Sequence, residues 1–241
     1  MGGARQARVG ILVALLVAAS LSTSACGQGV GPKVQSPQAA FDVAVSKADA
    51  AWHSGDAEAA FNLYTDALKI QGARDDGGLV AAQQGKAKRL VVSRRILAKA
   101  EPALGTLSSY VQVLQYSAAE STEAAAARNG LADCLKPYPK GMRAEVVALR
   151  RDIKANKSIA MPLTSALVVA LADGWLTEVA QAPGSSGTHA AAAAKHLGDA
   201  AAAVSKAFDS KYADDALADL ARADKALVAA AKELEAARTA E

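Results

Sequence analysis

The sequence is poor in aromatic residues and cysteine. Aromatic residues make up only 4% of the 241 residues, whereas alanine, the best helix former, supplies about a quarter of them. Strands prefer aromatic and β-branched residues, so this composition argues against a sheet. There are two cysteines, and a chain of this length can bury a hydrophobic core without a disulfide framework. The sequence therefore predicts an all-α protein, built of helical hairpins in an irregular helical bundle.

Charge is nearly balanced over most of the chain. The formal net charge is +3, and Arg5 and Arg8 are the only charged residues among the first 25. The remaining residues carry 25 basic and 24 acidic side chains. This balance gives no electrostatic reason to expect nucleic acid as a partner, so we predict none.

Motifs for catalysis and cofactor binding are missing. The sequence contains no G-x-S-x-G elbow, Walker loop, dinucleotide fingerprint, H-E-x-x-H or C-x-x-C pattern. We therefore predict that the protein is not an enzyme and has no catalytic, cofactor-binding or metal-binding residues. Cys134 is expected to be a small buried side chain, because its stretch ARNGLADCLK offers no cationic pair or helix N-terminus to activate the thiol.

The histidines and paired acids have structural explanations. His189 and His196 are seven residues apart and Asp199 follows, so all three share one helical face. Metal ligands usually lie closer together in sequence, and we expect surface histidines instead. The acid pairs at 75–76 and 214–215 stand at predicted helix starts, where carboxylates cap free N–H groups.

The first 25 residues have the order of a secretory signal. Arg5 and Arg8 precede the apolar run VGILVALLVAA, and the small residues SLSTSA follow it directly before Cys26. The apolar run is shorter than the roughly 20 residues that a membrane-spanning helix needs. We predict a signal peptide over residues 1–25.

The end of this segment resembles the signal of bacterial lipoproteins. In that family a cysteine follows small residues and its thiol receives a diacylglycerol. Ser24 and Ala25 match the small positions, while Thr23 stands where the family usually has an aliphatic residue. The resemblance implies that Cys26 carries a lipid such as palmitate and holds the protein on the extracytoplasmic face of the cell membrane, within the cell envelope. Two alternatives stay open: cleavage after Ala25 to give a secreted protein, and an uncleaved N-terminal anchor.

The rest of the chain divides into a tether and two helical segments. Residues 26–40 include GQGVGPKVQSPQ, which follows no helical period and predicts a flexible tether. Residues 41–182 are expected to form a helical domain. Residues 183–241, which begin within the flexible-looking APGSSG at 182–187, are expected to form an Ala- and Leu-rich hairpin.

The last helix of that hairpin carries a seam with steps of three and four residues. Its members are Leu217, Leu220, Leu227, Ala231 and Leu234, and Asp224 and Arg238 interrupt the pattern. The seam can close between two antiparallel helices of one chain, which is the economical prediction, or between two chains.

The start of the helical domain resembles one tetratricopeptide repeat, a helix hairpin. Gly55 stands at the turn, and Asp56 can cap the second helix. Ala60, Tyr64 and Ala67 lie on one apolar face of that helix and fall on the family's small and aromatic positions. The resemblance covers only residues 41–74, and the first helix lacks the family's Trp and Leu-Gly residues. No second repeat follows, and a generic alanine-rich hairpin is the alternative.

A helix is predicted over residues 79–100, with two apolar stripes. Leu79, Leu90 and Leu97 form one stripe, and Val92 and Ile96 form the other, which predicts neighbours on two sides. A basic set lies opposite the leucines: Lys88, Arg95 and Lys99. We expect a solvated helix face there, with docking on anionic lipid or an acidic wall polymer as the alternative.

Three further segments are less regular. YVQVLQY at 110–116 alternates like a strand, but a solitary strand would have no pairing partner, so we predict a helix. PYPKG at 137–141 is expected to end a helix. The most apolar segment after the signal, at 159–180, is too interrupted to span a membrane and is predicted to be the central core helix.

These features together predict a membrane-anchored envelope lipoprotein. Its helical domain is expected to bind a protein or peptide in the grooves between helices and to act as a scaffold. The alternative is a carrier of lipids or other apolar small molecules, which requires an enclosed cavity between helices. An enzyme of unrecognised type is the third possibility.

Overall fold

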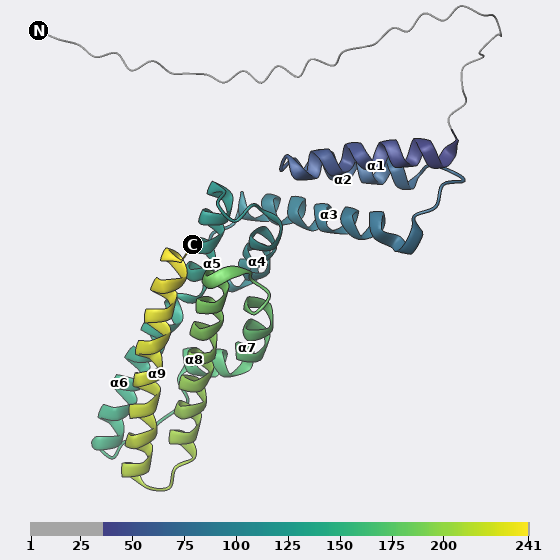
Figure 1. Cartoon of the computed structure of the whole chain (residues 1–241). Coiled ribbons are helices and arrows are strands. Elements are labelled where there is room, and N and C mark those ends of the chain that lie inside the picture. Colours follow the sequence, from purple (N-terminus) through teal and green to yellow (C-terminus); the bar gives the residue numbers. More distant parts are fainter. Residues whose placement is uncertain (1–35, 241) are drawn as a thin grey trace, which may run out of the picture. The chain divides into compact units, whose positions relative to one another are not determined.

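The structure is a computed structural model that describes residues 36–240, apart from the side chains of residues 172 and 173. The predicted signal peptide, Cys26 and most of the predicted tether lie outside these residues. Within them the chain forms nine α-helices, two short 3-10 turns and no strand, which confirms the all-α prediction (Figure 1). The elements are α1 Pro37–His53, α2 Ala57–Leu68, η1 Asp76–Gly78, α3 Leu79–Leu97, η2 Leu104–Thr106, α4 Leu107–Tyr116, α5 Thr122–Leu135, α6 Pro137–Lys154, α7 Leu163–Val179, α8 Gly184–Asp209 and α9 Ala213–Thr239.

Helix α1 begins earlier than the predicted end of the tether at residue 40. Ser36 Oγ accepts a hydrogen bond from the Ala39 N–H at 3.2 Å. Pro37 occupies the first turn, where its missing N–H does not cost a hydrogen bond of the helix. Gln38 then accepts a hydrogen bond from the backbone N–H of Arg74 at 3.0 Å. The residues SPQ are therefore a helix start, although their composition is typical of a linker.

Helices α1 and α2 form the predicted hairpin. Gly55 has φ +84°, a conformation that favours glycine, and Asp56 caps α2 by accepting a hydrogen bond from the Ala59 N–H at 2.9 Å. The buried Tyr64 hydroxyl donates to Asp49 at 2.5 Å and links the two helices. Their N-terminal core consists of Phe41, Ala48, Ala60, Tyr64, Ala67, Val80 and Ala87. The apolar face predicted for α2 is thus confirmed.

A second and larger core, the main core, includes Ala57 at the start of α2 and extends from the second half of α3 to the end of α9. Its largest fully buried side chains include Leu107, Leu131, Leu135, Met142, Leu197, Leu220 and Leu227. Helix α4, whose sequence alternates like a strand, contributes several residues to this core and confirms the prediction of a helix.

Helices α8 and α9 make the most extensive contact of any helix pair in the described residues. On α9 the buried residues alternate between alanine and leucine in steps of four and three: Ala216, Leu220, Ala223, Leu227, Ala230, Leu234 and Ala237. The facing α8 buries small residues, among them Gly187, Ala190 and Ala193. Small side chains let two helix backbones approach closely, so the predicted seam closes as a hairpin within the chain.

The main core does not divide at residue 183. Val168 and Trp175 of α7 belong to the same core as Leu197 of α8 and Leu220 of α9. The segments predicted as 41–182 and 183–241 are therefore packed together. The separate core is the N-terminal one, which α1 and α2 share with the first half of α3. The amino-acid composition changes near residue 183, but the residues that pack together are determined by which faces of the helices meet.

Helix α7 is not the central helix that its apolar sequence predicted. Leu163 is 85% exposed, Val169 50% and Leu167 41%, while only one face, with Val168 and Val179, is fully buried. The helix packs mainly against α8, with smaller contacts to α6 and α4. The hydropathy of a helix shows how apolar its residues are and does not show how many helices surround it. Helix α8 takes the central position instead of α7, because small residues line both of its faces.

Two predicted breaks are helix starts. PYPKG is the first turn of α6, where proline is tolerated because the N–H groups of the first turn have no helical partner. The predicted flexible APGSSG contains the first turn of α8, which begins at Gly184 with φ +74°. Ser186 is buried there, and its hydroxyl donates to the Ala237 carbonyl at 2.7 Å, which fixes the start of α8 against the end of α9.

Helix α3 contacts two helices, α2 and α4, but only one of its two predicted apolar stripes is packed. Leu90 is buried and Leu97 half-buried, but Leu79 is 70% exposed, since it starts the helix beyond the packed turns. Val92 and Ile96, the second predicted stripe, are 46% and 40% exposed. No described helix covers this second stripe fully.

Candidate functional site

A large, mainly apolar hollow lies between α6 and α9, and we name it the α6/α9 groove. Its volume is about 820 Å³. Leu227 and Leu234 form its buried floor, while Val147 and Val228 on its edges are 60% and 49% exposed. The groove is therefore open to solvent along its edges.

Small side chains explain the hollow. Ala144 of α6 and Ala231 of α9 both line the groove and are exposed. Ala231 was predicted to lie in the seam with α8, but the buried seam residue is the neighbouring Ala230, and Ala231 faces the groove instead. Where two packed helices carry alanine at their outer contact positions, no side chain fills the space between their edges.

The rim of the groove is mainly basic. Lys136, directly before α6, and Lys140 and Arg143 of α6 line it, and Glu235 of α9 is the acidic lining residue. Arg143 donates a hydrogen bond to Asp224 of α9 at 2.9 Å, so one guanidinium is already neutralised. Neither lysine has an ion-pair partner among the described residues. The groove thus combines an apolar floor with an α6 edge of unpaired positive charge.

The residues predicted to interrupt the α9 seam have partners on neighbouring helices. Asp224 pairs with Arg143 of α6, and Arg238 pairs with Asp133 of α5. Both side chains extend toward these neighbouring helices and away from α8, so they do not interrupt the alternation of buried alanine and leucine on α9. The sequence pattern correctly predicted two polar positions on α9, but it did not predict which helices these side chains contact.

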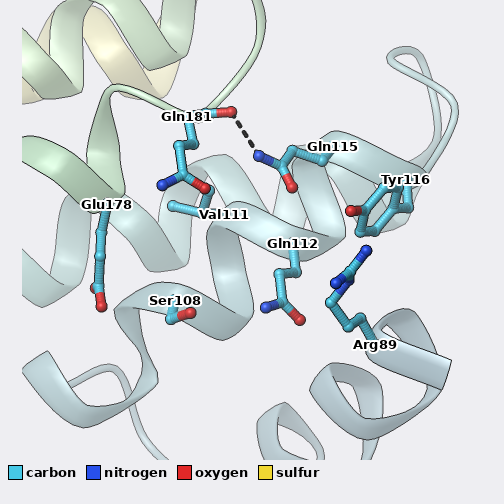
Figure 2. A pocket seen from close by; sticks show the side chains of 8 residues that line it. All are labelled: Arg89, Ser108, Val111, Gln112, Gln115, Tyr116, Glu178 and Gln181. Atoms are coloured by element: carbon cyan, nitrogen blue, oxygen red, sulfur yellow. Dashed lines mark hydrogen bonds between the residues drawn. The ribbon is translucent and has the colours of Figure 1, made fainter. Parts of the chain in front are cut away.

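A second hollow is polar and lies where α3, α4 and the end of α7 meet (Figure 2). Its volume is about 470 Å³, and Arg89, Tyr116 and Glu178 line it together with several amide side chains. Gln115 Nε2 donates to the Gln181 carbonyl at 2.9 Å, and Arg89 extends toward Tyr116 (Figure 2). We name it the polar pocket. Because its amides partly bond to the protein itself, it has fewer free groups than its size suggests.

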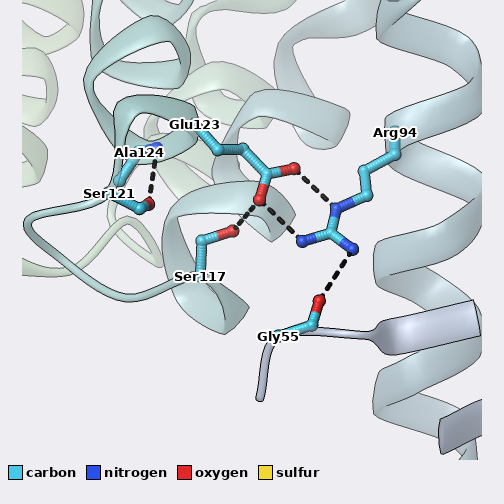
Figure 3. A network of polar contacts seen from close by, with 6 residues as sticks. All are labelled: Gly55, Arg94, Ser117, Ser121, Glu123 and Ala124. Atoms are coloured by element: carbon cyan, nitrogen blue, oxygen red, sulfur yellow. Dashed lines mark hydrogen bonds and ion pairs between the residues drawn. The ribbon is translucent and has the colours of Figure 1, made fainter. Parts of the chain in front are cut away.

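A charged network joins the α1–α2 turn to α5, and we name it the Arg94 network (Figure 3). Arg94 of α3 donates two hydrogen bonds to the Glu123 carboxylate, at 2.6 and 2.7 Å, and a third to the Gly55 carbonyl at 3.3 Å. Ser117 Oγ donates to the same carboxylate at 2.8 Å. The bonds from Arg94 lower the pKa of Glu123, and the bond to Glu123 raises the pKa of Arg94. Glu123 lies in the first turn of α5, and no local sequence pattern predicts its pairing with Arg94.

Cys26, the predicted lipidation site, lies outside the described residues. Cys134 is buried, with 2% of its surface exposed, and the Thr106 hydroxyl lies 3.6 Å from its sulfur. Burial raises the pKa of the Cys134 thiol, which keeps it protonated at neutral pH. This agrees with the prediction of a small buried side chain.

His189 is a helix-contact residue and not a free surface histidine. Its Nδ1 lies 2.6 Å from a carboxylate oxygen of Glu233, so the pair joins α8 to α9. His196 is half-buried. Among the described residues no cluster of three or more histidine, cysteine or acidic side chains has the geometry of a metal site.

The predicted acid caps are located as expected, and one cap was missed. Asp75 accepts hydrogen bonds from the Val80 and Ala81 N–H groups, both at 3.0 Å, at the start of α3. The pair at 214–215 lies in the first turn of α9. Glu145 of α6 caps α7, accepting hydrogen bonds from the Thr164 and Ser165 N–H groups at 2.8 and 3.0 Å. A cap supplied by another helix leaves no local signal in the sequence.

Comparison with known proteins found no matching family model, no matching curated protein and no matching solved structure. In residues 36–240 no helix has the length and hydropathy needed to cross a membrane.

Proposed function

We propose that the protein is a membrane-anchored envelope lipoprotein whose helical body binds a helical segment of a partner protein in the α6/α9 groove. The observation that carries the binding proposal is the open apolar groove with an unpaired basic edge. In this proposal the α1–α2 hairpin is a tetratricopeptide-like unit that adds scaffold surface.

The anchor part of the proposal rests on the signal-like segment and the cysteine that ends it. Two acyl chains on Cys26 would hold the protein firmly, because each buried methylene contributes about 0.8 kcal/mol. Replacing the thiol in Cys26→Ser removes the acceptor of the diacylglycerol. We expect the variant to leave the membrane fraction or to keep its signal, and the wild type to incorporate labelled palmitate. A processed Cys26→Ser protein that stays on the membrane, with no label on the wild type, would contradict the anchor.

The chemistry of the groove selects one type of occupant. An amphipathic helix can place aliphatic side chains, spaced three and four residues apart, over Leu227 and Leu234. Acidic residues beside that apolar stripe would lie next to Lys136 and Lys140, where opposite charges attract and like charges are rejected. The proposed partner is therefore an acidic amphipathic helix.

A carrier of apolar small molecules is less well supported. That function requires an enclosed cavity, which keeps a ligand's apolar surface out of water. Val147 and Val228 are exposed on the edges of the groove, so a long-chain ligand lying there would stay in contact with solvent. No observation favours an enzyme.

A synthetic peptide tests the binding proposal. A fluorescent amphipathic helix with leucines on one face and glutamates beside them is titrated with the protein and followed by anisotropy. We expect Val147→Asp with Val228→Asp to weaken binding by about tenfold or more, because apolar contact is lost and like charge is introduced. Val43→Asp, at an equally exposed valine of α1, is the matched control and should leave affinity unchanged.

A peptide with lysines in place of the glutamates should bind more weakly than the acidic one. Equal affinity for both peptides, or equal loss in the Val43 control, would contradict the groove as the binding site. Displacement of the bound peptide by a long-chain fatty acid would favour the carrier function.

A further inference from the structure

We infer that the outer face of α3 is a second membrane contact, which lies against anionic phospholipid headgroups. The inference rests on the proposed membrane anchor, because that anchor brings the face close to a lipid surface. It assigns a partner to Val92 and Ile96, two aliphatic residues that no described helix covers fully.

The exposed residues of this face follow helical spacing. Lys88, Val92, Arg95, Ile96 and Lys99 recur at intervals of three and four residues, so they project from one side of the helix. All five are exposed, and Val92 and Ile96 are 46% and 40% exposed. Aliphatic side chains with long cations on both sides are the arrangement found where a helix lies in a membrane interface.

Charge on this helix has one sign. Residues 79–100 contain no aspartate or glutamate. Arg94 is neutralised by Glu123 and Arg95 by Glu58, the latter at 2.6 Å. Lys88, Arg89 and Lys99 have no ion-pair partner among the described residues. The face therefore keeps unpaired positive charge although the chain as a whole is nearly neutral.

Lipid fits this face better than an acidic protein or polymer does. A specific protein partner needs a shaped contact such as the α6/α9 groove, whereas lipid headgroups need only cations beside shallow aliphatic side chains. A hydrophilic wall polymer would attract the lysines but gain nothing from Val92 and Ile96. Lysine can also extend its charge to the headgroups while its methylenes stay in apolar surroundings.

The contact need only be weak. Each cation near an anionic leaflet strengthens binding about fivefold, which corresponds to about 1 kcal/mol. A chain already held by a lipid anchor meets the same surface at a high effective concentration, so a contact that binds the free protein only weakly fixes the orientation of the anchored protein.

Vesicle sedimentation tests the inference without the anchor. Residues 26–241 with Cys26→Ser are mixed with vesicles of phosphatidylcholine alone, or of equal parts phosphatidylcholine and phosphatidylglycerol. We expect binding only to the anionic vesicles, and weaker binding as salt is added, because screening reduces the attraction. The lipid-free chain separates this result from the outcome of palmitate labelling, so either proposal can fail alone.

Two pairs of substitutions identify the face. Lys88→Gln with Lys99→Gln should weaken binding to anionic vesicles about 25-fold. The control is Lys225→Gln with Lys232→Gln, which removes the same charge from exposed positions of α9 and should leave binding unchanged. Equal losses in both pairs would overturn the inference, since they would reflect net charge alone. Absence of binding to the anionic vesicles would also overturn it.

The aliphatic pair separates lipid from other anions. Val92→Ser with Ile96→Ser keeps every charge and should still weaken vesicle binding several-fold, because less apolar surface reaches the acyl chains. Circular dichroism and thermal unfolding confirm that the variant is folded, as expected for exposed positions. Unchanged vesicle binding by this variant would overturn the assignment to lipid in favour of a soluble acidic polymer or protein.

Discussion

The hairpins α1–α2 and α8–α9 are both rich in alanine, but they differ in what surrounds them (Figure 1). Helices α8 and α9 pack against α5, α6 and α7 and share the main core. The α1–α2 hairpin packs on α3, shares the small N-terminal core with the first half of that helix, and contributes Ala57 to the main core. It reaches the rest of the protein through the Arg94 network and through Trp52, whose ring lies 6.2 Å from that of Tyr116 in an edge-to-face contact.

This difference teaches that helix formation and helix anchoring are separate properties. Local turn residues define the α1–α2 hairpin sharply, at Gly55 and Asp56, yet few elements hold it in place. The α8–α9 hairpin contacts three further helices. Regions with fewer buried contacts open at lower free energy, so α1–α2 should open locally while α8–α9 opens only with global unfolding.

The largest effect is expected at Leu220, which is fully buried between α9 and its neighbours. Leu220→Ala leaves a cavity and should lower the free energy of unfolding by about 2–5 kcal/mol, measured by urea denaturation. Lys232→Gln, at an exposed position of the same helix, should change it by less than about 0.5 kcal/mol. Glu233 is not a suitable control, because it pairs with His189. Equal effects of the two substitutions would mean that α8–α9 is not part of the main core.

A smaller and local effect is expected at Tyr64. Tyr64→Phe removes the hydroxyl that donates to Asp49, which should weaken the hairpin by about 1–2 kcal/mol. Amide hydrogen exchange should become faster in α1 and α2 and stay unchanged in α8 and α9. If exchange rose equally in both hairpins, the two regions would unfold as one unit and the comparison would fail.

The smallest effect concerns the Arg94 network and depends on pH. The pKa of Glu123 in the folded protein is below its ordinary value of 4.5, so ionised Glu123 stabilises the fold above that value and this contribution is lost as the pH falls through the folded pKa. Glu123→Gln should cost about 1 kcal/mol at neutral pH, since the pair is only partly buried. The difference from the wild type should shrink below pH 4.5.

The neighbouring ion pair provides the matched control. Glu58→Gln removes the partner of Arg95, but that pair is mostly exposed and should contribute less than about 0.5 kcal/mol. A pH-independent difference between Glu123→Gln and the wild type would show that the carboxylate charge is not what joins the α1–α2 turn to α5.

Local chemistry explains which parts of the fold were predictable from the sequence. Gly55 and Asp56 act within a few residues of themselves, and the cap by Asp75 acts on the next helix start, so all three were predicted. The stripe on α2 was predicted because helical periodicity is a property of one segment. The start of α6 at PYPKG was missed because proline at a helix start and proline after a helix end look alike in sequence.

Tertiary contacts explain the rest. The outer position of α7, its cap by Glu145 and the pairing of Arg94 with Glu123 each depend on a second helix whose placement no local pattern encodes. The α6/α9 groove follows from Ala231 facing outward, one residue from the buried Ala230. Periodicity could not separate two adjacent alanines that differ only in which neighbouring helix they meet.

The attachment of α1 has a mechanical consequence. Helix α1 is the first described element, and Gln38 in its first turn makes two hydrogen bonds with the backbone of Arg74. Tension applied at Ser36 would act first on this contact. Once that contact breaks, the 17 residues of α1 can peel from α2 one turn at a time. Extending them lengthens the chain by roughly 30 Å, since each residue spans about 1.5 Å in a helix and up to about 3.4 Å when stretched. The α1–α2 hairpin would therefore unfold and extend under load before the main core does.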